Sequence, residues 1–96
     1  MIRLIPVNKN NYLDCLKLKV KDDQSDLVAS NAVSLAQAYV FPKRAKPFVI
    51  YNDTEPVGFM MFDIDKDKPE YYIWRFMIDA KYQSKGYGSK ALREAV

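Results

Sequence analysis

The stretch Gln83-Ser84-Lys85-Gly86-Tyr87-Gly88 decides the fold. Residues 71–78 before it are aromatic or aliphatic, apart from Arg75, which is typical of a β-strand. Residues 89–96 after it carry apolar side chains at helical spacing. The sequence therefore predicts a strand, a glycine-bearing loop and a helix. The first backbone N–H groups of such a helix lack partners, and their partial positive charge attracts an anion.

Two glycines suit this loop to a phosphate. Gly86 and Gly88 let the backbone turn tightly, and they let a phosphate approach without a clashing Cβ atom. Gln83 offers an amide donor, Ser89 offers a hydroxyl group, and Lys85 adds positive charge. The spacing differs from that of a Walker loop, and the third glycine of a Rossmann fingerprint is missing. We therefore expect the loop to bind a diphosphate in a different way.

The whole sequence predicts the order β-α-α-β-β-β-α. This is an α/β (α+β) fold with a mixed, mostly antiparallel sheet and helices on its faces. Asn10 or Asn11 is expected to cap the first helix, and Ser30 or Asn31 the second. The strand at 71–78 is apolar on both faces, so it is expected in the middle of the sheet. The predicted strands are residues 2–7, 48–51, 57–64 and 71–78.

The second helix is expected to bury an apolar side made of Val33, Leu35, Ala36 and Tyr39. After it, two prolines bracket a basic loop at residues 42–47, because proline cannot continue a helix. The last helix reaches residue 96 without a C-capping signal, so we expect a partial domain with an exposed sheet edge. Exposed edges pair with other chains. The sequence therefore predicts a homodimer that completes the sheet, or a chain with little activity.

Composition narrows the kind of protein. The chain has 96 residues, enough for one domain spanning 1–96. Its single cysteine, Cys15, is expected in the core, and without histidine neither a zinc site nor a His-based triad is expected. The net charge of +3 comes from interspersed charges, which argues against a nucleic-acid partner. No signal peptide and no run of membrane-spanning length is recognised, which predicts a cytoplasmic protein with no membrane partner.

The loop fits the pattern Q/R-x-x-G-x-G/A, and in this it resembles the pyrophosphate-binding signature of the GNAT N-acetyltransferase family. Residues 74–82 resemble the family's fourth strand where it enters that loop. Residues 52–58 resemble the hairpin between its second and third strands. Residues 74–92 are the most specific part of the resemblance, and their sequence is most similar to that of bacterial spermidine/spermine acetyltransferases.

The resemblance implies acetyl-CoA as cosubstrate and a primary amine as acceptor. A polyamine such as spermidine or spermine is the first choice, and a protein or peptide amine the second. The backbone of Met77 and Ile78 would pair with the pantetheine arm like an added strand, and the Met77 amide would polarise the thioester carbonyl. The implied cofactor-binding residues are Met77, Ile78, Gln83, Ser84, Lys85, Gly86, Tyr87, Gly88 and Ser89.

The sequence assigns no proton-transfer residue. Members of the family often use a tyrosine beyond the fifth strand as general acid, and that position lies past residue 96. Asp63, Glu70 and Tyr72 are candidate proton acceptors, and no spacing singles one out. Arg75 has three open interpretations: an edge-exposed charge, an ion pair with an acid such as Asp63, or a part of the substrate cleft.

Two other classes of function stay open. One is a non-catalytic acyl-CoA-binding or regulatory module that keeps the loop without the chemistry. The other is a nucleic-acid-binding module that uses Tyr71, Tyr72 and Trp74 as stacking surfaces. The second is disfavoured, because the basic residues flank the start of the last helix and do not line the aromatic strand.

Overall fold

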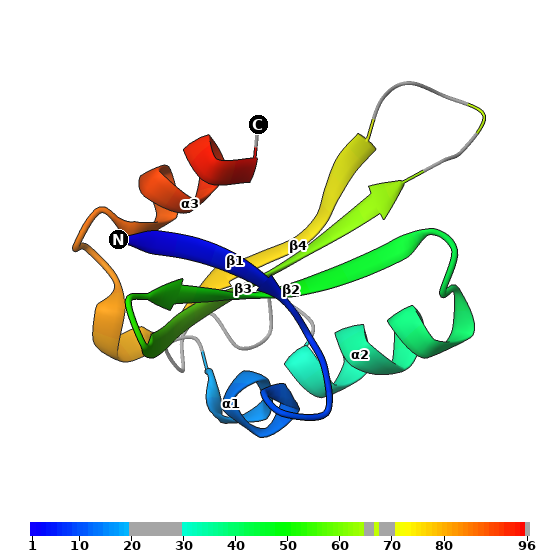
Figure 1. Ribbon diagram of the computed structural model, residues 1–96, viewed down its shortest axis with the longest axis horizontal. Helices are drawn as coiled ribbons and strands as arrows, with labels where there is room; N and C mark the ends of the chain where they lie inside the picture. The colour runs from blue at the N-terminus through cyan, green and yellow to red at the C-terminus, as the bar shows by residue number, and fades with distance from the viewer. Residues whose placement is uncertain (20–29, 65–66, 68–70, 96) are drawn as a thin grey trace.

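The computed structural model describes residues 1–19, 30–64, 67 and 71–95 of the chain. A four-stranded sheet forms the centre, with α1 and α2 on one face and α3 on the other (Figure 1). This is the predicted α+β class and the predicted order of elements. The elements are β1 (Ile2–Pro6), α1 (Tyr12–Lys17), α2 (Asn31–Val40), β2 (Ala45–Asn52), β3 (Glu55–Ile64), β4 (Tyr71–Ile78), the 3₁₀ turn η2 (Ala80–Tyr82) and α3 (Tyr87–Ala95).

The strands lie in the order β1-β2-β3-β4, and each neighbouring pair is antiparallel. Within the described residues the sheet therefore has no parallel pair, so the predicted mixed character is absent there. The expected central position of residues 71–78 is also wrong for this sheet, because β4 forms one edge. Tyr72 and Ile73 near its start are 61% and 43% exposed. The strand is apolar on both faces because helices pack against both sides of its other end.

Two clusters of buried side chains hold the layers together. One lies between the sheet and α1 and α2, and it includes Cys15, Phe59 and Met77. The other lies between the sheet and α3, and it includes Met60 and Ala91. Side chains alternate along β3, so this strand feeds both clusters. Each large apolar side chain buried in this way stabilises the fold by roughly 1.5–3 kcal/mol.

The two helix starts are capped differently. Ser30 caps α2 as predicted, because its side chain accepts a hydrogen bond from the Val33 N–H at 3.2 Å. Asn11 stands at the N-cap position of α1, yet its side chain makes no cap bond. Its Oδ1 instead accepts from the Asn8 N–H at 2.7 Å, and its Nδ2 donates to the Pro6 carbonyl at 3.1 Å. Asn11 therefore fixes the turn between β1 and α1.

The predicted apolar side of α2 is mostly wrong. Val33, Ala36 and Tyr39 are exposed, and only Leu35 of the predicted four is partly buried. The helix instead buries Asn31 and Ser34. Asn31 is satisfied there by donating to a backbone carbonyl of α1, and the small Ser34 allows close approach to the sheet.

The basic loop predicted at residues 42–47 is shorter than expected. Strand β2 already begins at Ala45 and includes Pro47, which pairs with Met61 of β3. A proline is tolerated in a strand where its missing N–H leaves no ladder bond unmade. Of the polar turn expected at residues 65–70, only Asp67 lies among the described residues.

Candidate active site

The open edge of β4 is defined by its ladder with β3. The Asp79 N–H donates to the Val57 carbonyl at 2.8 Å, and Met77 lies opposite Phe59 in the same register. In an antiparallel pair, alternate residues point their N–H and C=O groups at the partner strand. Met77 therefore faces β3, whereas Phe76 and Ile78 turn their backbone groups outward. This corrects the expectation that the Met77 amide lies at the open edge.

Gly58 allows β3 and β4 to approach closely at this end. A Cβ atom on Gly58 would lie 2.5 Å from the Met77 carbonyl oxygen and 2.9 Å from the Ile78 Cδ1 atom. Real Cβ atoms do not approach backbone oxygens so closely, so a larger residue would push the two strands apart. A glycine inside a strand often marks such an approach. The close contact with β3 thus fixes the position of the outward-facing backbone groups of β4.

The glycine loop is folded back onto the end of β4. The Gln83 side-chain Nε2 donates to the Ile78 carbonyl at 3.0 Å, which closes the loop against the strand. Ser84 and Gly86 both adopt positive φ, at 67° and 81°. Left-handed residues interspersed in a turn make successive backbone N–H groups converge into an anion-binding concavity. Gln83, expected to donate to phosphate, has a loop-closing bond in this structure.

Helix α3 starts directly after this loop and packs on β4. A Cβ atom on Gly88 would lie in ordinary van der Waals contact with the Phe76 ring, at 3.4 Å, so the helix start lies directly against the strand. The helix has nine residues, and its first N–H groups face the loop side. A helix N-terminus of this kind favours an anion.

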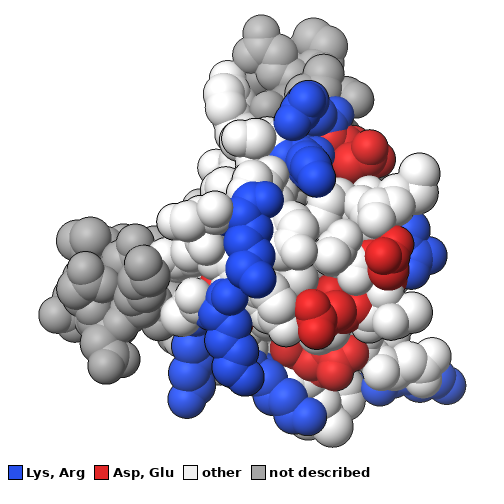
Figure 2. Space-filling model, turned by 90° about the vertical axis from the view of Figure 1, so that its left-hand side faces the viewer, with Lys and Arg blue, Asp and Glu red and all other residues white. Residues whose placement is uncertain are grey.

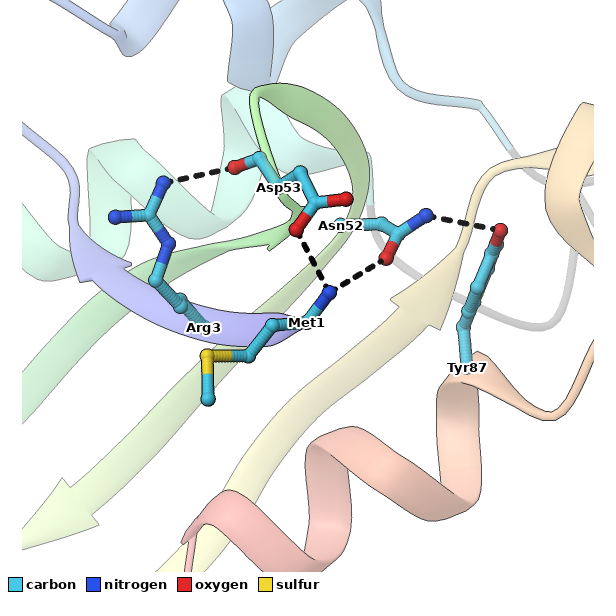
Figure 3. Close-up of polar contacts among 5 residues, drawn as sticks. All are labelled: Met1, Arg3, Asn52, Asp53 and Tyr87. Carbon is cyan, nitrogen blue, oxygen red and sulfur yellow. Dashed lines mark hydrogen bonds and ion pairs between the residues drawn. The ribbon is translucent and has the colours of Figure 1, made fainter.

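The tip of the β2–β3 hairpin also fixes the helix start. The Asn52 side-chain Nδ2 donates to the Tyr87 hydroxyl at 3.1 Å (Figure 3). The Met1 ammonium donates to Asn52 Oδ1 at 3.3 Å and to Asp53 Oδ1 at 2.8 Å. This ammonium lowers the pKa of Asp53, first through the hydrogen bond and then through its charge. Arg3 completes the network through the Asp53 carbonyl.

The surface around the loop carries a row of basic side chains. Figure 2 views the side that carries the hairpin tip, η2 and the start of α3, where this row lies beside a group of acidic side chains. The Lys85 Nζ atom lies 6.0 Å from the Tyr82 ring centre, and the Tyr82 and Tyr87 rings are 6.2 Å apart. Burial, followed by the Glu55 carboxylate, raises the pKa of Tyr82. The exposed basic residues of this segment are Lys81, Lys85, Lys90 and Arg93.

The family described as Acetyltransferase (GNAT) family matches residues 13–96. The chain belongs to this family. It is 32% identical, over 99% of its length, to the spermine/spermidine N(1)-acetyltransferase of Bacillus subtilis strain 168. A protein of Bacillus subtilis subsp. natto called probable spermine N(1)-acetyltransferase matches at the same identity and coverage. The chain spans 66% of the length of each of these relatives, or about two thirds.

A solved structure supports the fold of the family. The crystal structure of an acetyltransferase from Thermus thermophilus matches with a TM-score of 0.64. The match covers 99% of this chain and 67% of that one, at 17% sequence identity. At this identity the likeness concerns the fold alone. In this GNAT fold, the end of β4, the glycine loop and the start of α3 form one contiguous candidate site.

Asp79 joins three segments at this site, and no role was predicted for it from the sequence. Its carboxylate accepts from the Lys19 N–H at 2.8 Å and from the Lys81 N–H at 3.2 Å. The Ala80 N–H in turn donates to the Lys19 carbonyl at 2.8 Å. Asp79 therefore caps η2 and ties the chain after α1 to the end of β4. Aspartate side chains at the start of a turn commonly accept a hydrogen bond from the backbone N–H two residues later, and this preference could have identified Asp79.

The predicted proton acceptors lie at the other end of β4. Asp63 and Tyr72 are cross-strand partners, so the structure brings these two together. They are five residues along the strand from Met77, or about 17 Å at 3.3 Å per residue. Asp63 is also held by Arg44 in a bidentate pair at 3.0 Å. Glu70 lies outside the described residues.

Arg75 does not form the ion pair with Asp63 that was one of its interpretations. Its side chain donates to the Gln37 Oε1 atom at 3.1 Å and to the Trp74 carbonyl at 3.1 Å. It also lies 5.6 Å from the centre of the Trp74 ring. The guanidinium is thus half-buried on the α2 face of β4, with neutral partners.

Cys15 lies in the core, as predicted. It is fully buried, and burial raises its pKa to about 11. Within the described residues there is no group of three or more His, Cys, Asp or Glu side chains that could hold a metal ion. In the same part of the chain, no helix combines the length and apolar character needed to cross a membrane.

Proposed function

We propose that the protein is an acetyl-CoA-dependent N-acetyltransferase that acts on a primary amine. The observation that carries the proposal is the contiguity of three features at one end of β4. The strand has an outward-facing backbone at Phe76 and Ile78, the loop has left-handed residues at Ser84 and Gly86, and a helix starts immediately after. Membership of the GNAT family supports the same activity.

Each part of acetyl-CoA has a counterpart in this arrangement. The diphosphate would lie at the start of α3, against backbone amides between Lys85 and Ser89, with the row of lysines nearby. The pantetheine arm would add to the open edge of β4 and pair with the outward groups of Phe76 and Ile78. The proposed backbone donors on β4 are thus Phe76 and Ile78. The side chain of Met77 packs in the buried cluster between the sheet and helices α1 and α2.

The proposed reaction is a direct transfer. The acceptor ammonium first loses a proton to solvent or to a base, which leaves a neutral amine. The amine nitrogen forms a bond to the acetyl carbon while the C–S bond breaks, and an outward amide of β4 stabilises the carbonyl oxygen. The nitrogen then loses its second proton and the CoA thiolate gains one, so the products are an N-acetylated amine and CoA thiol.

We propose a polyamine as the acceptor. The support is that two relatives at 32% identity have names that specify spermine or spermidine acetylation. A protein or peptide amine is the alternative acceptor. A cytoplasmic location and a homodimer also belong to this proposal, and sedimentation at several concentrations would test the dimer.

Cosubstrate binding is tested by titration calorimetry with acetyl-CoA, CoA and pantetheine. Pantetheine keeps the arm and lacks the diphosphate, so it should bind at least about tenfold more weakly if the loop holds that group. Inorganic pyrophosphate should compete with CoA. Equal affinity for CoA and pantetheine would contradict the role of the loop.

Turnover is tested by measuring CoA thiol release with spermidine, spermine and a lysine-containing peptide as separate acceptors. The proposal expects the highest kcat/KM with a polyamine. Faster transfer to the peptide would support the alternative acceptor. Acetyl-CoA binding without transfer to any amine would support a non-catalytic acyl-CoA-binding module and defeat the enzyme proposal.

A further inference from the structure

Arg75 is a half-buried cation without an acidic partner among the described residues. Its Nε atom is buried and has no hydrogen-bond partner, and its two terminal nitrogens donate to neutral oxygens of Trp74 and Gln37. Taking a guanidinium out of water is costly unless a carboxylate compensates its charge. Packing alone does not account for a charge at this position, because an uncharged side chain would fill the same space without that cost.

The surroundings of Arg75 leave its charge uncompensated. Helix α2, which packs against it, has no charged residue. On β3 the nearby acid is Asp63, and Arg44 already neutralises it. On α1, Asp14 accepts a hydrogen bond from the Tyr51 hydroxyl. Directly after β4, Asp79 accepts hydrogen bonds from the Lys19 and Lys81 N–H groups. The other charged or titratable groups described on this side of the sheet are Lys9, Tyr12, Cys15, Lys17, Lys19, Tyr39, Lys43, Lys46 and Tyr72.

Arg75 lies beside the proposed position of the acetyl group. It directly precedes Phe76, whose backbone faces the open edge, so the guanidinium lies within roughly 10 Å of that edge. Helix α3 covers the face of β4 that carries the Phe76 and Ile78 side chains. Arg75 is on the opposite face, because its side chain donates to Gln37 of α2. Helices α1 and α2 both lie on that face of the sheet (Figure 1). An amine that attacks the acetyl carbon from the side not filled by α3 would meet this charge.

We propose that Arg75 supplies a fixed positive charge that favours the neutral, nucleophilic form of the acceptor amine. This inference rests on the proposed acetyl transfer and extends it to the origin of the free amine. A neighbouring positive charge disfavours an ammonium ion, because two like charges repel in a partly desolvated site. At roughly 10 Å and an intermediate dielectric constant, the effect is about one pH unit. Arg75 thus does part of the work of a general base without accepting a proton.

The test is the pH dependence of kcat, which reports proton equilibria in the enzyme–substrate complex. In Arg75→Gln, the midpoint of the acidic limb should move up by about one pH unit, with kcat at high pH nearly unchanged. Arg75→Lys keeps a charge and should move the midpoint little. A uniform loss of kcat at every pH in Arg75→Gln would overturn the proposal, since that is the signature of structural damage.

Gln37→Glu tests the same idea without removing the arginine. The new carboxylate would stand where the Gln37 Oε1 atom now accepts from Arg75, and it would neutralise the charge in place. The midpoint should again rise, even if Arg75→Gln does not fold. Arg44→Gln is the matched control, because the charge of Arg44 is already paired with Asp63.

Failure of this inference differs from failure of the proposed function. A parent protein that transfers acetyl groups, with the same kcat midpoint in Arg75→Gln and Gln37→Glu, would overturn the role of Arg75 alone. A parent protein that transfers no acetyl group to any amine would overturn both.

Discussion

The two ends of β4 differ in how firmly they are held. At its last residues, Gly58 brings β3 into close approach, and Gln83 bonds back to the Ile78 carbonyl. At its first residues, Tyr72 and Ile73 are exposed. One strand thus passes from a loosely covered start to a tightly fixed end within eight residues.

This difference indicates where chemistry is positioned. Transfer of a small group needs hydrogen-bond donors that are fixed to within a fraction of an ångström. Of the two ends of β4, only the last residues are held both by β3 and by the glycine loop. The candidate acids predicted from sequence lie at the other end, where the Asp63–Arg44 pair is partly exposed. Substitutions at the two ends should therefore have unequal effects.

The largest effect is expected from Gly58→Ala. The new Cβ atom would overlap the Met77 carbonyl, so β3 and β4 must separate. Overpacking of this kind costs roughly 3 kcal/mol of unfolding free energy, measured by urea denaturation. Acetyl-CoA affinity should fall as well, because the outward groups of β4 shift. Normal stability in this variant would show that the two strands are not held as described.

Asp79→Ala is expected to cost roughly 2–3 kcal/mol, because the Lys19 and Lys81 N–H groups both lose their acceptor. Asp79→Asn keeps one oxygen and should lose about half as much. Ser30→Ala, which removes the α2 cap and no hydrogen bond of the loop, is the control and should cost about 1 kcal/mol without changing CoA affinity. Equal CoA affinities in Asp79→Ala and the control would remove Asp79 from the site.

Gly86→Ala should weaken CoA binding about tenfold in calorimetry. Its φ of 81° costs about 1–2 kcal/mol for a residue with a Cβ atom, although nothing lies within 4 Å of that position. Ser84→Gly is the opposite substitution, because Ser84 already has a φ of 67°. It should leave binding intact and raise stability slightly. Tight CoA binding by Gly86→Ala would mean that the loop can hold phosphate in another conformation.

The smallest effect is expected at the start of β4. Asp63→Asn breaks a partly exposed ion pair with Arg44, which is worth about 0–1 kcal/mol. Since the pair lies far from Met77 along the strand, kcat should stay within about twofold of the parent value. A large fall in kcat at all pH values would return Asp63 to the list of proton acceptors and break the contrast between the two ends.

Backbone features of the site were predictable from the sequence, and side-chain partners were not. The loop, its glycines and the helix after it follow from local residue types, because positive φ and helix starts have clear signals. The partners of Arg75 and Asp79 depend on α2 and on the chain after α1, which are distant in sequence. The edge position of β4 was missed because burial by helices gives the same apolar pattern as burial inside a sheet.

The bond from Gln83 to the Ile78 carbonyl has a consequence for molecular length. It closes residues 78–83 into a small ring, and the Asn52 bond to the Tyr87 hydroxyl holds the helix start, so the span from the strand edge to the helix start is nearly constant. A cosubstrate has its diphosphate at one end and its thioester at the other. The fixed span would therefore select cosubstrates by the length of the arm between these two groups. Arms shorter or longer than pantetheine would then place the acyl carbon off the edge of β4, however well the phosphates bind.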